Sequence, residues 1–338
     1  MPLRIGFVGF RHSHIYELHK KASETDGVEV VAACEEDEAT RAEAAAHGVT
    51  ITHRLAEDLI DGDDCDVIAI GDYFSRRGSL ALKALRAGKH AIVDKPICTD
   101  LAELDEIERL SGETGLKVGC MLTMRDSRPM NGLRDLVRNG TIGKVNAISF
   151  GGQHPMRMDS RPAWYFEPDK HGGTINDIGI HATDSIPWMT GLGFRSVNAA
   201  RCWNANVPQY PDFKDGAQMM LTMDNGSGVL GDVSYFMPSE GGYSLPLYWR
   251  TTVFGEKGIL EAALVSTEIM VALDGGVEGR PVPEVTSGGY FEGFLRDIRG
   301  EAGEEDLDTG AVIRAARTAL IIQKTADDGS HDVPLTDG

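Results

Sequence analysis

The chain has 338 residues, of which 41% are hydrophobic and 25% are charged, a composition typical of a globular protein and not of a disordered one. This length exceeds what one hydrophobic core usually serves, so about two domains are expected. The 33 Lys and Arg against 52 Asp and Glu give a formal net charge of −19, which disfavours nucleic acid and membrane surfaces as partners.

The cysteines and the hydropathy favour a cytoplasmic protein. Five cysteines without a CxxC pair argue against a disulfide framework and against a structural zinc site. No apolar run approaches the roughly 20 residues that span a bilayer. The first residues lead directly into a strand pattern and lack the features of a signal peptide.

Strand and helix patterns alternate over the first 120 residues. Strands are predicted at residues 3–7, 28–34, 66–70, 91–93 and 117–122. Helices are predicted at residues 14–23, 39–47, 79–87 and 101–114. This alternation predicts an α/β domain with a parallel, doubly wound sheet, which binds ligands beyond the carboxyl ends of its strands.

The pattern changes after about residue 123. Helices are predicted at residues 131–139, 177–190 and 309–325, and a strand at 144–150 is followed by an irregular stretch, 151–173. Residues 197–264 alternate in the strand manner and predict a mostly antiparallel sheet. We therefore expect one domain over residues 1–122 and an α+β domain over residues 123–338.

The turn after the first strand is a weak dinucleotide signal. Only Gly9 fits the G-x-G-x-x-G pattern, because Arg11 and His14 occupy the positions of the other glycines. Glu35 ends the second strand, where a carboxylate would bind the adenosine ribose hydroxyls and repel a 2′-phosphate, favouring NAD over NADP. Its alternative is a solvated acid at a strand end. Arg11 could pair with the pyrophosphate or could block its site.

Three histidines near this turn, His12, His14 and His19, suggest metal binding. No acidic or cysteine partner is near them in sequence, so we expect no metal site and expect these side chains to contact ligand or core. Lys95, in the sequence Asp94-Lys95-Pro96, follows the fourth strand and is a candidate for chemistry; the alternative is an ordinary surface lysine.

Residues 172–184 are the most informative stretch. Asp177, His181 and Asp184 share one polar stripe at helical spacing, and a histidine flanked by carboxylates can serve as acid or base near neutral pH. The alternatives are a metal site with a single nitrogen ligand and a surface cluster of ion pairs. Pro187 should kink or shorten this helix.

The irregular stretch before that helix carries side chains that suit a polyhydroxylated or anionic substrate. These are His154, Arg157, Arg161, Trp164, Tyr165 and His171. We expect Arg161 and Trp164 to bind substrate; alternatively, Trp164 and Phe166 anchor a packed surface loop.

Three motifs in order resemble those of the Gfo/Idh/MocA family of NAD(P)-dependent oxidoreductases, over nearly the whole chain. Asp94-Lys95-Pro96, with residues 87–93 before it, is similar to the family's EKP motif. Residues 172–184 resemble its GG…D-x-G-x-H-x-x-D signature, and residues 254–258 its later G-x-x-G turn.

The resemblance implies a Rossmann domain followed by a domain whose open sheet forms a homodimer or homotetramer. It implies an enzyme that transfers a hydride between NAD(H) and a secondary alcohol or ketone of a sugar, inositol or related polyol. Lys95 would polarise the reacting oxygen, His181 would take its proton, and Asp177 would orient both histidine and substrate, with Asp184 also near the substrate. The implied cofactor-binding residues are Gly9, Phe10, Arg11, His12, Glu35, Asp72 and Lys95.

The sequence departs from the family pattern at two places. Arg11 and His14 replace glycines, and Asp72-Tyr73-Phe74, with Arg77 near the usual histidine, replaces the family's proline-and-asparagine turn. Both departures fall in the implied nicotinamide and pyrophosphate pocket. Two alternatives stay open: transient oxidation that drives elimination or glycoside cleavage, and a non-catalytic ligand-binding paralogue in which Arg11 closes the nucleotide site.

Overall fold

A computed structural model describes residues 1–62, 64–284, 286 and 288–335. It divides into two compact units, of which the first comprises Met1–Met121, Pro162–Gly172 and Tyr290–Ile313 and the second the rest of the described chain. The sequence predicts continuous domains over residues 1–122 and 123–338; the units differ in that two later segments join the first one. The bond from Val118 N to Thr309 Oγ1 (3.0 Å) and the Lys117–Asp297 ion pair (3.0 Å) attach one of these segments to the last parallel strand.

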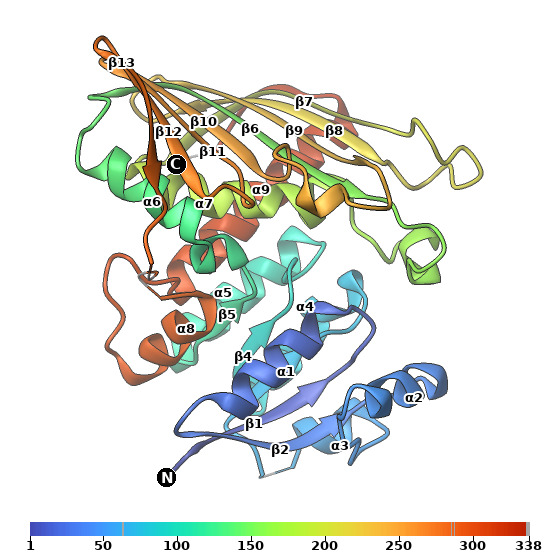
Figure 1. The fold of residues 1–338 in the computed structure, drawn as a ribbon. Helices are drawn as coiled ribbons and strands as arrows, with labels where there is room; N and C mark the ends of the chain where they lie inside the picture. Colours follow the sequence, from blue (N-terminus) through green and yellow to red (C-terminus); the bar gives the residue numbers. More distant parts are fainter. Residues whose placement is uncertain (63, 285, 287, 336–338) are drawn as a thin grey trace. The chain divides into compact units, whose positions relative to one another are not determined.

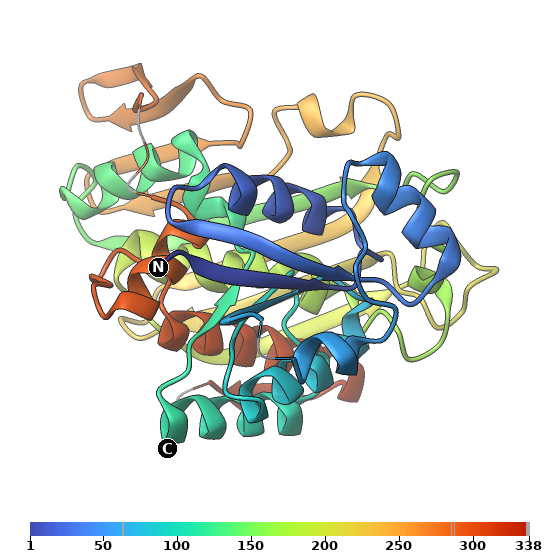
Figure 2. The ribbon, with the colours of Figure 1, turned by 90° about the horizontal axis from the view of Figure 1, so that it is seen from below.

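The first unit is a parallel sheet in the order β2-β1-β3-β4-β5. Its strands are β1 (Leu3–Val8), β2 (Val28–Cys34), β3 (Val67–Ile70), β4 (His90–Val93) and β5 (Val118–Cys120). Its helices are α1 (His14–Glu24), α2 (Glu38–Ala46), α3 (Ala56–Ile60), α4 (Phe74–Arg86), α5 (Leu101–Thr114) and α8 (Tyr290–Arg299). Helix α1 lies on one face of the sheet and α4 and α5 lie on the other (Figure 2). The predicted doubly wound sheet is confirmed.

Local features of the sequence explain where the observed helices of this unit agree with the predicted ones and where they differ. The five-residue helix α3 is too short to show a helical period and was not predicted. Helix α4 begins at Phe74, one turn before the predicted start, and its preceding residue, Tyr73, makes no side-chain capping bond. Helix α5 has the predicted bounds because Asp100 caps Ala102 N and Glu103 N at its start and Gly115 ends it at φ 74°.

The second unit is a nine-stranded sheet in the order β13-β12-β11-β10-β6-β9-β8-β7-β14. Only the β6–β9 pair is parallel among the pairs of the described strands, which confirms a mostly antiparallel sheet. The strands are β6 (Val145–Pro155), β7 (Phe194–Trp203), β8 (Gly216–Met223), β9 (Gly228–Met237), β10 (Arg250–Gly255), β11 (Gly258–Ala262), β12 (Glu268–Leu273), β13 (Gly276–Pro281) and β14 (His331–Pro334).

Helices cover one face of this sheet. They are α6 (Arg128–Arg138), α7 (Ile180–Thr190) and α9 (Thr309–Asp328), seen together below the strands in Figure 1. Burial alternates accordingly, since Met219 and Leu221 are buried while Met220 and Leu230 are 47% and 59% exposed. Among the described residues, no helix has the length and apolarity needed to cross a bilayer.

Part of the irregular stretch predicted at 151–173 is strand, because β6 continues to Pro155. The glycines Gly151 and Gly152 interrupt its apolar alternation; at Gly152 a Cβ would lie 2.8 Å from Cη2 of Trp249, so the indole requires a glycine there. Strand β13, with the sequence GVEGRP, has no such alternation and was not predicted; β12, β14 and α8 were also missed.

Helix α1 packs directly on the residue that follows β3. A Cβ on Gly71 would lie 2.5 Å from Cβ of Ile15 and 2.7 Å from the Gly9 carbonyl oxygen. Both neighbours are fixed by the sheet and the helix, so neither can withdraw cheaply.

We expect Gly71→Ala to lower the free energy of unfolding by about 1–3 kcal/mol through overpacking. Gly112→Ala is the matched control, because this glycine lies inside α5 with no atom within 4 Å of the added Cβ. Alanine should stabilise that helix by about 0.5–1 kcal/mol. Urea unfolding of the three proteins measures both effects, and an equally stable Gly71→Ala protein would contradict this packing.

Candidate active site

The turn after β1 requires its glycine. Gly9 has φ 81°, donates its N–H to the Cys34 carbonyl (2.9 Å), and leaves no room for a Cβ, which would lie 2.8 Å from the Asp72 amide nitrogen. The turns that follow β1 and β3 are therefore in close contact at the carboxyl ends of the strands.

Glu35 organises this turn. Its carboxylate is 1% exposed and accepts hydrogen bonds from Phe10 N (2.7 Å), Arg11 Nε (2.9 Å) and Asp37 N (2.8 Å). The interpretation of Glu35 as a solvated acid is wrong, because the side chain is buried. The carboxylate lies where the sequence places it, at the end of β2, and its pairing with Arg11 was not foreseen.

The start of α1 fits an anion. Ser13, its N-cap, makes no side-chain capping bond, so the positive end of the helix dipole is not neutralised by a cap. Arg11 and His14 flank this end with side chains that are 20% and 36% exposed. These residues suit the pyrophosphate of a dinucleotide, the group that Rossmann domains bind at this place.

Asp72 holds the turn that follows β3. It is buried and accepts hydrogen bonds from Tyr73 N (2.7 Å) and Arg76 Nη1 (2.9 Å). Burial raises the pKa of Asp72, and the charge of Arg76 opposes that rise. Arg76 also pairs with Glu36 (2.8 Å), so one guanidinium joins the ends of β2 and β3.

Asp94, fully buried at the end of β4, is the centre of a polar cluster. Its Oδ2 lies 2.5 Å from His12 Nδ1 and 2.9 Å from Arg77 Nη2, and Arg77 also donates to the Asp72 carbonyl (2.7 Å). Burial by itself would raise the pKa of Asp94, but Arg77 and the two histidines His12 and His14 hold it well below its usual value. The carboxylate is therefore ionised.

Lys95 and His12 lie beside this carboxylate. Lys95 is 3% exposed, with Nζ 5.8 Å from the centre of the Phe74 ring, so the interpretation as a surface lysine is wrong. Burial lowers the pKa of His12 to about 3, and its Nε2 lies 3.0 Å from the hydroxyl of Tyr165.

The predicted substrate loop is divided between the two units. Trp164 belongs to the first unit, where its Nε1 donates to the Arg11 carbonyl (3.1 Å) and its ring packs 4.9 Å from that of Phe74. Arg161 belongs to the second unit, where it donates to the Pro155 carbonyl (2.8 Å) and lies 5.4 Å from the Tyr235 ring centre. Trp164 is an anchor of the first unit's core, as one of the two interpretations expected.

The helix that carries Asp177 and His181 begins as a π-turn, Ile175–Gly179, and continues as α7. Gln323 of α9 caps its start, since its Oε1 accepts the N–H of Ile175 (2.9 Å). Gly173, at φ 97°, lies so close to the Gln323 side chain that a Cβ would overlap it. The paired glycines of the motif therefore allow a side chain from α9 to reach the first amides of this turn.

Asp177, His181 and Asp184 are each less than 5% exposed, so the interpretation as a surface ion-pair cluster is wrong. Asp177 accepts a hydrogen bond from the Tyr235 hydroxyl. Asp184 instead pairs with Arg125 (2.6 Å), whose guanidinium lies 5.6 Å from the Trp188 ring centre. The sequence did not indicate this partner for Asp184. Pro187 lies inside α7, which ends at Thr190.

Aromatic rings surround the histidines of the second unit. The His154 ring centre lies 5.4–6.4 Å from those of four residues, and one of them, Trp249, is 5.5 Å from the His181 ring. The four are Tyr235, Tyr243, Tyr248 and Trp249. The sequence analysis missed them, although the run of aromatic residues between 235 and 249 is a visible signal. Such rings suit the apolar faces of a cyclic substrate.

Known proteins resemble the chain along most of its length. Residues 3–121 match the family model described as "Oxidoreductase family, NAD-binding Rossmann fold", and residues 130–261 match the GFO/IDH/MocA C-terminal domain. Inositol 2-dehydrogenase 2 of Saccharopolyspora erythraea is 26% identical over 83% of this chain and 79% of that protein. Inositol 2-dehydrogenase of Salmonella paratyphi B is 26% identical over 80% of each.

Solved structures share the fold. An inositol dehydrogenase homologue from Azotobacter vinelandii, complexed with NAD+, has a TM-score of 0.82 at 18% identity over 99% of this chain and 97% of that one. Myo-inositol 2-dehydrogenase from Lactobacillus plantarum has a TM-score of 0.76 at 23% identity over 98% and 100%. With both family models matched in order, the chain belongs to the Gfo/Idh/MocA family of NAD-binding oxidoreductases.

Proposed function

We propose that this protein is an NAD-dependent dehydrogenase that interconverts a secondary alcohol and a ketone on a sugar, an inositol or a related polyol. The observation that carries the proposal is the burial of Asp177, on a capped π-turn, and of His181, in the first turn of α7, beside the aromatic rings of Tyr235 and Trp249. Relatives named inositol 2-dehydrogenase support the substrate class.

Each residue of the proposed site has one role. Bound NAD supplies the acceptor for the hydride that leaves the substrate carbon. Lys95 donates a hydrogen bond to the reacting oxygen and polarises it, which stabilises the charge that develops there. His181 takes the proton of the hydroxyl as general base and returns it in the reverse direction. Asp177, held by Tyr235, orients the histidine and a neighbouring substrate hydroxyl.

Glu35 sets the proposed preference for NAD over NADP. A buried carboxylate at the end of β2 accepts ribose hydroxyls and repels a 2′-phosphate. Arg11 would then leave its partner Glu35 and pair with the pyrophosphate at the start of α1.

The non-catalytic alternative also has an observation in its favour. Glu35 already holds both Phe10 N and Arg11, as expected for a turn that has closed on itself. In that case Arg11 blocks the nucleotide site, and Lys95 and His181 serve only as structure.

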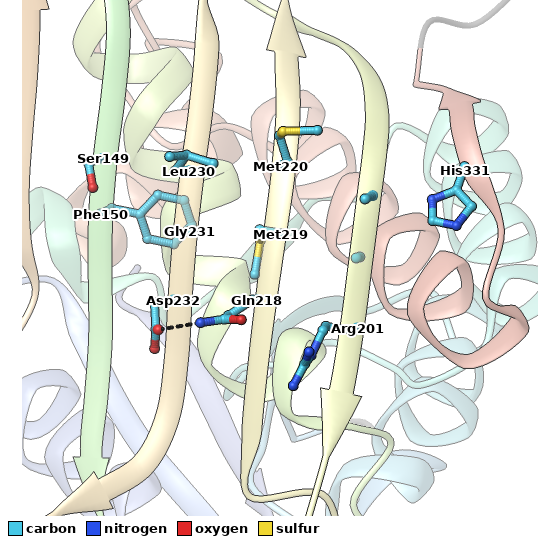
Figure 3. A pocket seen from close by; sticks show the side chains of 12 residues that line it. Ser149, Phe150, Arg201, Gln218, Met219, Met220, Leu230, Gly231, Asp232 and His331 are labelled. Carbon is cyan, nitrogen blue, oxygen red and sulfur yellow. Dashed lines mark hydrogen bonds between the residues drawn. The ribbon is translucent and has the colours of Figure 1, made fainter.

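We also propose a homodimer or homotetramer formed through the exposed face of the nine-stranded sheet. Met220 and Leu230 lie on neighbouring strands of a shallow apolar hollow, whose Gln218–Asp232 hydrogen bond (3.0 Å) appears in Figure 3. Phe236 and Phe254 of the same sheet are 40% and 39% exposed. Apolar side chains gathered on one sheet face are typical of a subunit interface.

Lys95→Ala and His181→Ala should each lower kcat by roughly 10²–10⁴-fold, because each removes a group that moves or stabilises charge in the transition state. Lys324→Ala and His47→Ala are the controls, since both side chains are exposed. The measurement is NADH formation in a polyol screen, with circular dichroism to confirm folding. Full activity in either test variant would contradict the role assigned to that residue.

Calorimetry with nucleotide-free protein distinguishes a nucleotide site that can bind NADH from one that Arg11 blocks. The proposal expects NADH to bind more tightly than NADPH, Glu35→Gln to reduce that preference, and Arg11→Ala to weaken NADH binding by about tenfold, the loss of one charge-assisted contact. The closed-site alternative expects no binding to the wild type, and binding only after Arg11→Ala.

Leu230→Glu should convert the oligomer to monomers, because it places a charge in the apolar hollow. Leu55→Glu is the matched control, as this leucine is 53% exposed on the first unit. Light scattering after gel filtration measures the mass of each protein. A wild-type monomer, or an unchanged mass in Leu230→Glu, would overturn the proposed interface.

A further inference from the structure

We propose that His12, His14 and Asp94 form a site for a divalent transition-metal ion at the carboxyl ends of β1 and β4. Each of the three side chains offers one ligand atom, and these atoms all lie within 4.8 Å of one another. None of the steps proposed above uses a metal, so this site is an addition to the proposed function, with which it shares His14.

The distances suit a small ion. His12 Nδ1 lies 2.5 Å from Asp94 Oδ2, and His14 Nδ1 lies 3.4 Å from Asp94 Oδ1. Ligands about 2.0–2.2 Å from a tetrahedral ion are separated from one another by roughly 3.3 Å. One imidazole therefore faces each carboxylate oxygen; the His14–Asp94 distance is close to the required spacing, and the His12–Asp94 pair must open.

The carboxylate of Asp94 also suits a metal. Asp94 is fully buried, and within the described residues no donor makes a hydrogen bond to its Oδ1, which leaves a lone pair for coordination. Binding of an ion at Nδ1 would move the proton that His12 shares with Asp94 Oδ2 to Nε2 of the same ring.

A second layer of contacts would hold these ligands in place. With an ion on His12 Nδ1, the Nε2–H can donate to the hydroxyl oxygen of Tyr165, 3.0 Å away. Arg77 fixes Asp94 through Nη2 (2.9 Å). Metal-binding histidines and carboxylates usually have such partners, which set the orientation of the ligand.

The donor set identifies the class of ion. Two imidazoles and one carboxylate suit Zn²⁺, Co²⁺ or Mn²⁺, whereas Ca²⁺ and Mg²⁺ prefer oxygen ligands only. Three protein ligands leave a coordination position open, as in catalytic rather than structural zinc sites. The side chain of His14, 36% exposed, gives solvent access to the cluster.

The same contacts have another explanation, a hydrogen-bonded chain from Asp94 through His12 to Tyr165 that needs no metal. In that chain His14 has no part. His14 therefore distinguishes the two, and its partial exposure makes substitution tolerable for the fold.

The test is titration of the metal-free full-length protein with Co²⁺, followed by visible absorption, and with Zn²⁺, followed by calorimetry. We expect one ion per chain, displacement of Co²⁺ by Zn²⁺, and no competition from Mg²⁺. His14→Ala should weaken binding by about tenfold or more, the order found when support of a metal site is lost. His47→Ala, an exposed histidine of the same unit, should bind as the wild type does.

Asp94→Asn is the second variant, and it should abolish the Co²⁺ spectrum if the protein folds by circular dichroism. If it does not fold, His14→Ala decides alone. No Co²⁺ binding to the wild type, equal affinity in His14→Ala, or equal loss in His47→Ala would each overturn the proposal.

Discussion

The buried charge of Asp94 is the constraint on which the first unit's site depends. A carboxylate removed from water must be paired, and Arg77 pairs it while also binding the carbonyls of Asp72 and Asp94. One guanidinium thus joins the ends of β3 and β4. Breaking such a pair typically costs about 3–5 kcal/mol because the remaining charge stays buried. The position of His12 follows from this pair, since its Nδ1 contacts the same carboxylate, and Lys95 is the next residue in the chain after Asp94.

In the second unit, buried carboxylates and backbone amides are likewise paired, with different partners. Asp184 is buried against Arg125, Asp177 accepts from Tyr235, and the first amides of the π-turn are held by Gln323. Each contact satisfies a polar group that would otherwise be costly to bury. The π-turn itself, a rare geometry that is frequent at functional sites, brings Asp177 into this network.

The sequence alone predicted the elements and site residues whose signal is local. The apolar runs of the parallel strands, the capped bounds of α5, and the Asp177–His181 spacing are all readable within a few residues. The partners of these groups could not be predicted from neighbouring residues. Asp94 is 82 residues from His12, and Tyr235 is 58 residues from Asp177, so neither pair leaves a periodic pattern.

Other predictions were wrong because tertiary contacts overrode weak local patterns. Strand β6 has a glycine at 152 because Trp249 packs against it, and Pro162–Gly172 joins the first unit through contacts such as that of Trp164 with Arg11. Neither contact can be predicted from the secondary-structure propensities of the residues. At the degraded glycine motif the Glu35 carboxylate accepts the N–H of Phe10 from 25 residues away, a contact that no local pattern indicates.

The capping of the π-turn by Gln323 has a consequence for biosynthesis. The two bonded groups, Ile175 N and Gln323 Oε1, are 148 residues apart in the chain. A ribosome adds about 5–20 residues per second, so the turn is made several seconds before its cap emerges. The parallel sheet can form early, but the geometry around Asp177 is complete only when α9 has been synthesised. The folded form of this turn therefore exists only when almost the whole chain has been made.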